Sequence, residues 1–137
     1  MSKGNVTEAD IIAFLFNATA MPSYGANLYV ALHTADPGEA GTMASSECDY
    51  DGYARVAVAR DNTGWTCSGN QAVNTAEVTW PECEDTFVGT QTATHASVGT
   101  AGGQILYSGA IGQPGGIVIA ALITPRAPAG ALVFTED

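Results

Sequence analysis

The N-terminal part of the chain has the pattern of one short helix. Thr7 stands where an N-cap hydroxyl is expected, and the carboxylates of Glu8 and Asp10 lie where a helix dipole favours negative charge. The helix is expected to end between residues 17 and 20, before Pro22. Its apolar residues fill more than one narrow stripe, which predicts a broad buried face against a sheet or a partner chain. The residues expected to bury it are Ile11, Phe14 and Leu15.

Beyond residue 26 the apolar positions recur at every second residue, which is the pattern of β-strands. Leu28, Val30 and Leu32 share one face of the segment 27–33. Turn residues separate most of the segments. The expected strands are 27–33, 53–60, 76–80, 91–98, 104–110, 116–123 and 131–135. The residues expected in the core are Leu28, Val30, Leu32, Val56, Val58, Val78, Ile105, Val118 and Leu132.

Short strands with no clear helix between them predict a mainly β fold. We expect an antiparallel, jelly-roll-like β-sandwich with one short N-terminal α-helix. A single domain is expected over residues 1–137, with a helical segment at 1–22 and strands and loops at 27–137. If the face of Leu32 is buried, Leu32→Ala should lower the free energy of unfolding by about 2–5 kcal/mol.

The charge balance narrows the choice of partners. Four Lys and Arg stand against fourteen Asp and Glu, and the net charge of −10 repels phosphate backbones and anionic membranes. We therefore expect neither nucleic acid nor a membrane as a partner. Arg55 and Arg60 are expected on opposite strand faces, with one of them paired to an acid. Residues 1–19 lack the pattern of a signal peptide, so folding in a cytosol is expected.

Cysteine and histidine are too sparse and too scattered for a metal site. The thiols of Cys48, Cys67 and Cys83 stand singly in the sequence and are expected to be reduced. Zinc knuckles take their ligands in close pairs, and neither these cysteines nor His33 and His95 form such a pair. Each histidine falls within an expected strand, where a structural role is favoured over a catalytic one.

The acidic clusters have two possible interpretations. The first cluster suggests weak calcium binding or, more simply, a turn-rich loop, and consists of Asp36, Glu39, Glu47, Asp49 and Asp51. A second cluster, Glu82, Glu84 and Asp85, could supply glycosidase carboxylates but has the composition of a solvated loop. The glycine-rich segment 99–103 is expected to be a hairpin turn. We therefore predict no catalytic, cofactor-binding or metal-binding residue, no cofactor and no enzyme activity.

The order of the segments resembles a family of small virion proteins of tailed bacteriophages. Its most specific parts are the run Leu-Tyr-x-Ala-Leu-His-Thr-Ala-Asp-Pro at 28–37 and Gly-Tyr-Ala-Arg at 52–55. The resemblance continues over 74–81, 89–98 and 106–110. It implies a jelly-roll cement, or decoration, protein on the outer surface of an HK97-type capsid. The implied partners are the major capsid protein and a second copy in a homodimer, with no cofactor.

Two other functions remain open at this point. A host-recognition module of a tail fibre or baseplate would use exposed aromatics such as Tyr24, Tyr50 or Trp65 to stack on a sugar, although packing of these rings on the rim of the sandwich is favoured. A hydrolase would use acids of the loops, with Glu82 and Asp51 as the residues to test. The resemblance favours the capsid protein over both.

Overall fold

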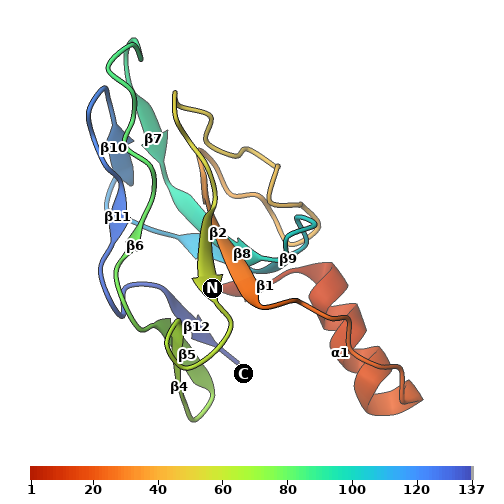
Figure 1. Ribbon diagram of the computed structural model, residues 1–137. Helices are drawn as coiled ribbons and strands as arrows, with labels where there is room; N and C mark the ends of the chain where they lie inside the picture. Colours follow the sequence, from red (N-terminus) through yellow and green to blue (C-terminus); the bar gives the residue numbers. More distant parts are fainter. Residues whose placement is uncertain (137) are drawn as a thin grey trace.

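The computed structural model describes residues 1–136, which form short antiparallel strands and one helix at the N-terminal end (Figure 1). The expected mainly β, sandwich-like fold with a single short helix is therefore confirmed. The helix is α1 (Asn5–Asn17), and the strands are β1 (Ser2–Lys3), β2 (Asn27–His33), β3 (Val56–Ala59), β4 (Trp65–Ser68), β5 (Gln71–Asn74), β6 (Val78–Thr79), β7 (Gln91–Ala93), β8 (His95–Gly99), β9 (Ile105–Ala110), β10 (Ile117–Ile119), β11 (Arg126–Ala127) and β12 (Val133–Thr135).

The largest sheet has the strand order β1-β9-β8-β2-β3, with every pair antiparallel. Strand β2 is buried on both faces from its fourth residue onward. Val30 and Leu32 belong to the main core, whereas Ala31 packs with Met43 and Ile105 in a small second cluster. The alternation in the sequence located the strand correctly, but it did not show that both faces are covered.

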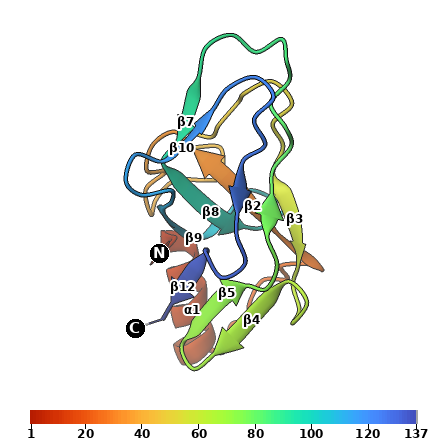
Figure 2. The ribbon, with the colours of Figure 1, turned by 90° about the vertical axis from the view of Figure 1, so that its left-hand side faces the viewer.

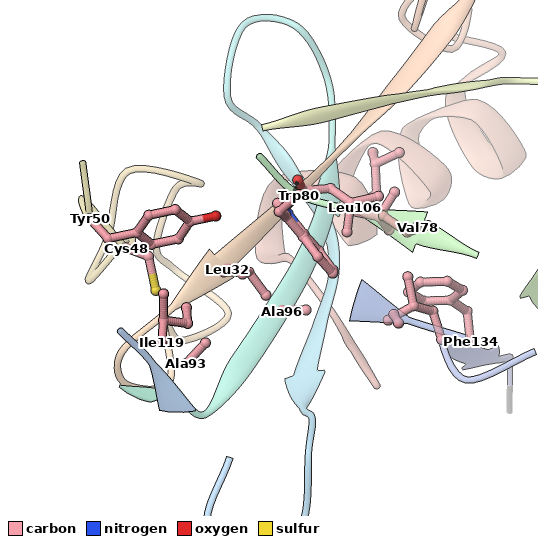
Figure 3. Close-up of a cluster of buried hydrophobic side chains, with 14 of the residues drawn as sticks. Leu32, Cys48, Tyr50, Val78, Trp80, Ala93, Ala96, Leu106, Ile119 and Phe134 are labelled. Carbon is pink, nitrogen blue, oxygen red and sulfur yellow. Dashed lines mark hydrogen bonds between the residues drawn. The ribbon is translucent and has the colours of Figure 1, made fainter. Parts of the chain in front are cut away.

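Three small sheets complete the sandwich: β7 with β10, β6 with β11, and β12-β5-β4. Figure 2 shows β7 and β10 at one end of the molecule and β4, β5 and β12 at the other. Between them lies the main core, in which Figure 3 places Trp80 between Tyr50 and Ile119 on one side and Phe134 on the other. The indole N–H of Trp80 donates to the carbonyl of Val30 over 3.1 Å, so this large ring is both buried and oriented.

Several strand predictions need correction. The segment 91–98 belongs to two strands, because Thr94 separates β7, which pairs with β10, from β8, which pairs with β2 and β9 in the large sheet. The hairpin of β4 and β5 was missed, since half of its strand residues are polar and its turn depends on Gly69 at a φ of +59°. Val118 is exposed instead of buried, because Ile117 and Ile119 are the residues of β10 that turn toward the core.

The helix begins earlier than the sequence predicts. Its N-cap is Gly4 and not Thr7, and no side chain caps it. Gly4 lies so close to β9 that a Cβ atom there would collide with the carbonyl oxygen of Ile105. Thr7 instead lies one turn into the helix, buried, with its hydroxyl donating to that same carbonyl over 3.0 Å. The hydroxyl that was expected to cap the helix therefore attaches it to the sheet.

The expected broad buried face of α1 is also not found. Phe14 and Leu15 are more than half exposed, Ile11 is only half-buried, and Thr7 is the single buried residue of the helix. Figure 1 shows α1 projecting beyond the sheet, held mainly at its first turn. It ends at Asn17, within the expected range, with Ala18 in the left-handed conformation. No helix among residues 1–136 has both the length and the hydropathy to cross a membrane.

Candidate functional site

The two histidines are partners across β2 and β8, and both have structural surroundings. His33 is fully buried. Its Nδ1–H donates to the Ser45 carbonyl over 2.8 Å, which leaves Nε2 to accept from the Ser97 hydroxyl over 2.8 Å. Burial lowers the pKa of His33, so the neutral ring is favoured. His95 contacts the hydroxyl of Thr94. The hydroxyl that donates to His33 belongs to Ser97, which is itself only 1% exposed, so this serine–histidine pair is out of reach of a substrate.

The cysteines do not gather into a metal centre. Cys48 and Cys83 are buried and Cys67 is exposed, all as free thiols. Burial, followed by the nearby charges of Asp49 and Glu47, raises the pKa of Cys48 to about 12, so this thiol is held in its unreactive protonated form. Within the described part of the chain, no three His, Cys, Asp or Glu side chains stand close enough to hold a metal ion.

Glu47 of the first acidic cluster has a structural partner. Arg55 binds its carboxylate with two nitrogens, Nε to Oε1 at 2.7 Å and Nη2 to Oε2 at 2.8 Å. Tyr53 donates its hydroxyl hydrogen to the same carboxylate and accepts the backbone N–H of Leu32, each over 3.0 Å. Arg55 is therefore the arginine that pairs with an acid, whereas Arg60 donates Nε–H to the Gly25 carbonyl. The hydrogen bond to Glu47 is also the main reason that the pKa of Arg55 is raised.

The other acids that were candidates for calcium or glycosidase chemistry mostly fix loops. Asp36 accepts the backbone N–H of Gly38 over 2.9 Å, which is an ordinary turn contact. Asp49 accepts the amide of Gln91 over 2.7 Å. The side chains of Asp51 and Glu82 have only long contacts of 3.4 Å to threonine hydroxyls. No carboxylate pair with an activated proton donor emerges from these contacts.

The aromatic residues proposed as a sugar platform are largely inside the fold. Tyr50 is fully buried, its ring meets Tyr53 edge-on at 5.3 Å, and its hydroxyl donates to a backbone carbonyl. Trp65 is also buried and meets Phe134 at 5.6 Å. Tyr24 is half-buried. Tyr50 and Trp65 therefore pack inside the sandwich, as the favoured interpretation expected, and the exposed platform that the host-recognition alternative requires is not formed by them.

The surface instead exposes apolar residues on α1. We call this surface the helix patch; each member is more than half exposed, and Phe16 reaches 77%. Its members are Val6, Ile12, Phe14, Leu15 and Phe16. Since an α-helix has about 3.6 residues per turn, Ile12, Leu15 and Phe16 share one side of α1, whereas Val6 and Phe14 lie on the other. The patch continues into a neutral stretch, since residues 11–35 contain no Asp, Glu, Lys or Arg. An exposed apolar surface of this kind marks a place where a protein binds another molecule.

A second apolar feature is a pocket of about 460 Å³ between the large sheet and the β4-β5-β12 sheet. We call it the inter-sheet pocket. It is lined by Leu28, Arg60, Asp61, Asn62, Trp65, Cys67, Ala72, Val98, Leu106, Tyr107 and Phe134. Its volume lies in the range of ligand sites, which is roughly 300–1,000 Å³. The buried indole N–H of Trp65 finds no hydrogen-bond partner among the described residues.

Neither apolar surface was predicted as a binding site. The only signal in the sequence was a helix too apolar to stand alone, which pointed to a partner chain as one of two ways to cover it. The inter-sheet pocket could not be foreseen, because the hairpin that forms one of its walls was itself missed.

Comparison with known proteins identifies the family. No curated protein matches the chain. One family model does, over residues 2–135, and its description is podophage GP4 fiber I protein gp80. The match confirms the resemblance at the level of a phage structural protein, while the description names a fibre and not a capsid. Since the match covers nearly the whole sequence, the chain belongs to the family of the podophage GP4 fiber I protein gp80.

Proposed function

We propose that this chain is a structural subunit of the virion of a tailed phage and acts by binding other virion proteins. The observation that carries the proposal is the family match over residues 2–135. The helix patch supports it, because α1 offers an apolar surface that its own chain does not cover. The buried His33 and Cys48 and the paired Glu47 support it too, since their contacts serve the fold.

The location we propose first is a fibre, because the family description names one. In that location the chain contributes structure instead of a sugar-binding platform, since Tyr50 and Trp65 are buried. Its proposed partners are a second copy of itself and neighbouring fibre or tail proteins. Contacts of this kind need no cofactor and no catalytic residue.

The second candidate location is the outside of the head, as a cement protein on the major capsid protein. The segment order that resembles decoration proteins favours it. A cement protein also binds through apolar contacts, and many equivalent copies multiply a modest affinity. The helix patch serves this role as well as it serves a fibre.

Immunogold labelling of intact virions distinguishes the fibre from the head as the location of this chain. Antibodies against the purified chain, coupled to gold, are applied to virions and imaged by electron microscopy, with antibodies adsorbed on the same chain as the control. Label confined to fibres at the tail is the expected result. Label distributed over the head would overturn the fibre and support the cement protein. Virions that carry no label, together with a chain found only in the lysate, would overturn the structural role itself.

A further inference from the structure

We propose that the β4-β5-β12 sheet is hinged over the inter-sheet pocket and that the side chain of Glu136 holds it closed. The hinge lies at Asn74, and Glu136 lies at the opposite end of the sheet. Because Glu136 forms an ion pair with the large sheet, the hinged sheet should open more often as the salt concentration rises. The inference goes beyond the proposed structural role and does not depend on it.

The hinged sheet is connected to the rest of the chain at one end. The chain enters β4 at Trp65, leaves β5 at Asn74 and enters β12 at Val133, and the strand register places these three residues at the same end. Asn74 is buried, and its side-chain amide donates to two backbone carbonyls over 2.8 and 2.9 Å. Its side-chain oxygen accepts the backbone N–H of Leu132 over 2.9 Å. These bonds fix the connecting segments to one another and make this end the hinge.

The opposite end of the sheet is held through Glu136. The backbone N–H of Glu136 donates to the carbonyl of Asn70 over 2.8 Å, so this residue is attached to the turn between β4 and β5. Its carboxylate reaches the large sheet, where it accepts from the ammonium group of Lys3 over 2.6 Å and from the hydroxyl of Tyr107. Within residues 1–136, these are the hydrogen bonds and ion pairs that join the two sheets. We call Lys3, Tyr107 and Glu136 the clasp.

The closed arrangement has costs that the clasp offsets. The pocket of about 460 Å³ leaves apolar walls without full contact, and the buried indole N–H of Trp65 has no partner among the described residues. Protein interiors are normally close-packed, and a buried donor without an acceptor loses the hydrogen bond that water would give it. Rotation of the sheet about Asn74 admits water to this N–H. It also separates the ring of Phe134 from Tyr107, which lies 5.7 Å away in the closed form, so the open form is the minor state.

The clasp is exposed enough for salt to weaken it. The side chains of Lys3 and Glu136 are 26% and 43% exposed, so dissolved ions screen the attraction between them. A partly exposed ion pair contributes little free energy. A small change is sufficient here, because a sheet attached at one end opens locally without unfolding of the whole chain. The salt concentration therefore controls how often the pocket opens.

Hydrogen exchange of the two indole N–H groups, followed by NMR, tests the hinge in the wild type. The Trp65 N–H reports on the pocket, whereas the Trp80 N–H, bonded to the carbonyl of Val30 in the core, reports on unfolding of the whole chain. The variant Trp65→Phe assigns the two signals. Trp65 should exchange faster than Trp80, and its rate should rise when sodium chloride is increased from a low concentration to about 1 M.

Glu136→Ala removes the clasp. Its Trp65 N–H should exchange about 5–30-fold faster than in the wild type at low salt, because an ion pair and a hydrogen bond are lost, and added salt should not accelerate it further. Glu136→Gln keeps an acceptor for Tyr107, so its increase should be smaller and equally independent of salt. The matched control is Glu77→Ala, since Glu77 is ion-paired with Arg126 and its 41% exposure is close to the 43% of Glu136. This control should exchange like the wild type.

Four outcomes would overturn the inference. Equal exchange rates of Trp65 and Trp80 in the wild type would show that the sheet does not open on its own. Equal acceleration of both signals in Glu136→Ala would indicate a loss of global stability instead of local opening. A Glu77→Ala variant as fast as Glu136→Ala would indicate a general effect of the lost charge. A wild-type Trp65 rate that does not rise with salt would refute the role of the ion pair, and this measurement decides the question even if the Glu136 variants fail to fold.

Discussion

The hydroxyl of Tyr53 extends the β2 ladder beyond the end of β3, and its removal tests how the sandwich is held at that point. Strand β3 pairs with β2 only as far as Val30, so it offers no carbonyl to the backbone N–H of Leu32. The phenol oxygen accepts that N–H over 3.0 Å and donates to Glu47 over 3.0 Å. Burial, followed by the influence of Glu47, raises the pKa of Tyr53, so the phenol stays protonated and can donate.

Tyr53→Phe should lower the free energy of unfolding by about 2–4 kcal/mol. Leu32 is fully buried, and an orphaned N–H at such a site costs about 1–3 kcal/mol. The bond to the carboxylate adds about 1 kcal/mol, because Glu47 is half-buried and keeps its two bonds to Arg55. Urea unfolding followed by tryptophan fluorescence at pH 7 measures the change, with all proteins at one concentration in case the subunits associate.

The matched control is Tyr29→Phe, which deletes the same atom. The Tyr29 hydroxyl makes no hydrogen bond to another described residue, and Tyr29 is half-buried like Tyr53. Its variant should stay within about 0.5 kcal/mol of the wild type. If the two variants lose equal stability, the Leu32 N–H finds another acceptor, and the argument that a phenol replaces a strand is refuted.

Three further outcomes are expected. Leu32→Ala should cost about 2–5 kcal/mol in urea unfolding because Leu32 is fully buried, whereas Leu122→Ala, at a 62% exposed residue, should cost less than about 0.5 kcal/mol. Burial lowers the pKa of His33 below its ordinary 6.5, so the unfolded chain binds the proton first and stability falls as the pH drops below about 6.5. The slope between pH 7 and 5 should be shallower in His33→Gln. A thiol reagent should modify Cys67 of the folded protein first, with the two buried cysteines reacting only in urea.

The alternation of apolar residues predicted the strands because successive side chains of a strand point to opposite faces, so a strand buried on one face has an apolar residue at every second position. Strand β2 was placed at its observed bounds, and the hairpin turn at 99–103 was correct, since glycine turns are local features. The phase of β10 was wrong because Ile117, Val118 and Ile119 are all apolar, and only the neighbouring strand decides which of them points inward.

Burial within irregular segments could not be read in the same way. Met43, Cys48 and Tyr50 lie in the loop between β2 and β3 and are all buried, although this loop has no period from which to assign a face. Their position depends on long-range contacts, such as the bond from the Tyr50 hydroxyl to the carbonyl of Pro81. The only hint was that these apolar residues occur singly among acids and small polar residues.

The helix shows a different kind of error, which bears on function. An apolar helix is expected to pack against another surface, but the sequence does not say whether that surface belongs to the same chain or to another one. The large rings of Trp65, Trp80 and Tyr50 are buried in the core of the chain, whereas the rings of Phe14 and Phe16 are exposed. Sugar recognition needs exposed rings with polar groups beside them, whereas the exposed phenylalanines lie in a stretch without charge. The chemistry that remains at the surface of α1 is therefore suited to contact with another protein and not to the recognition of a sugar.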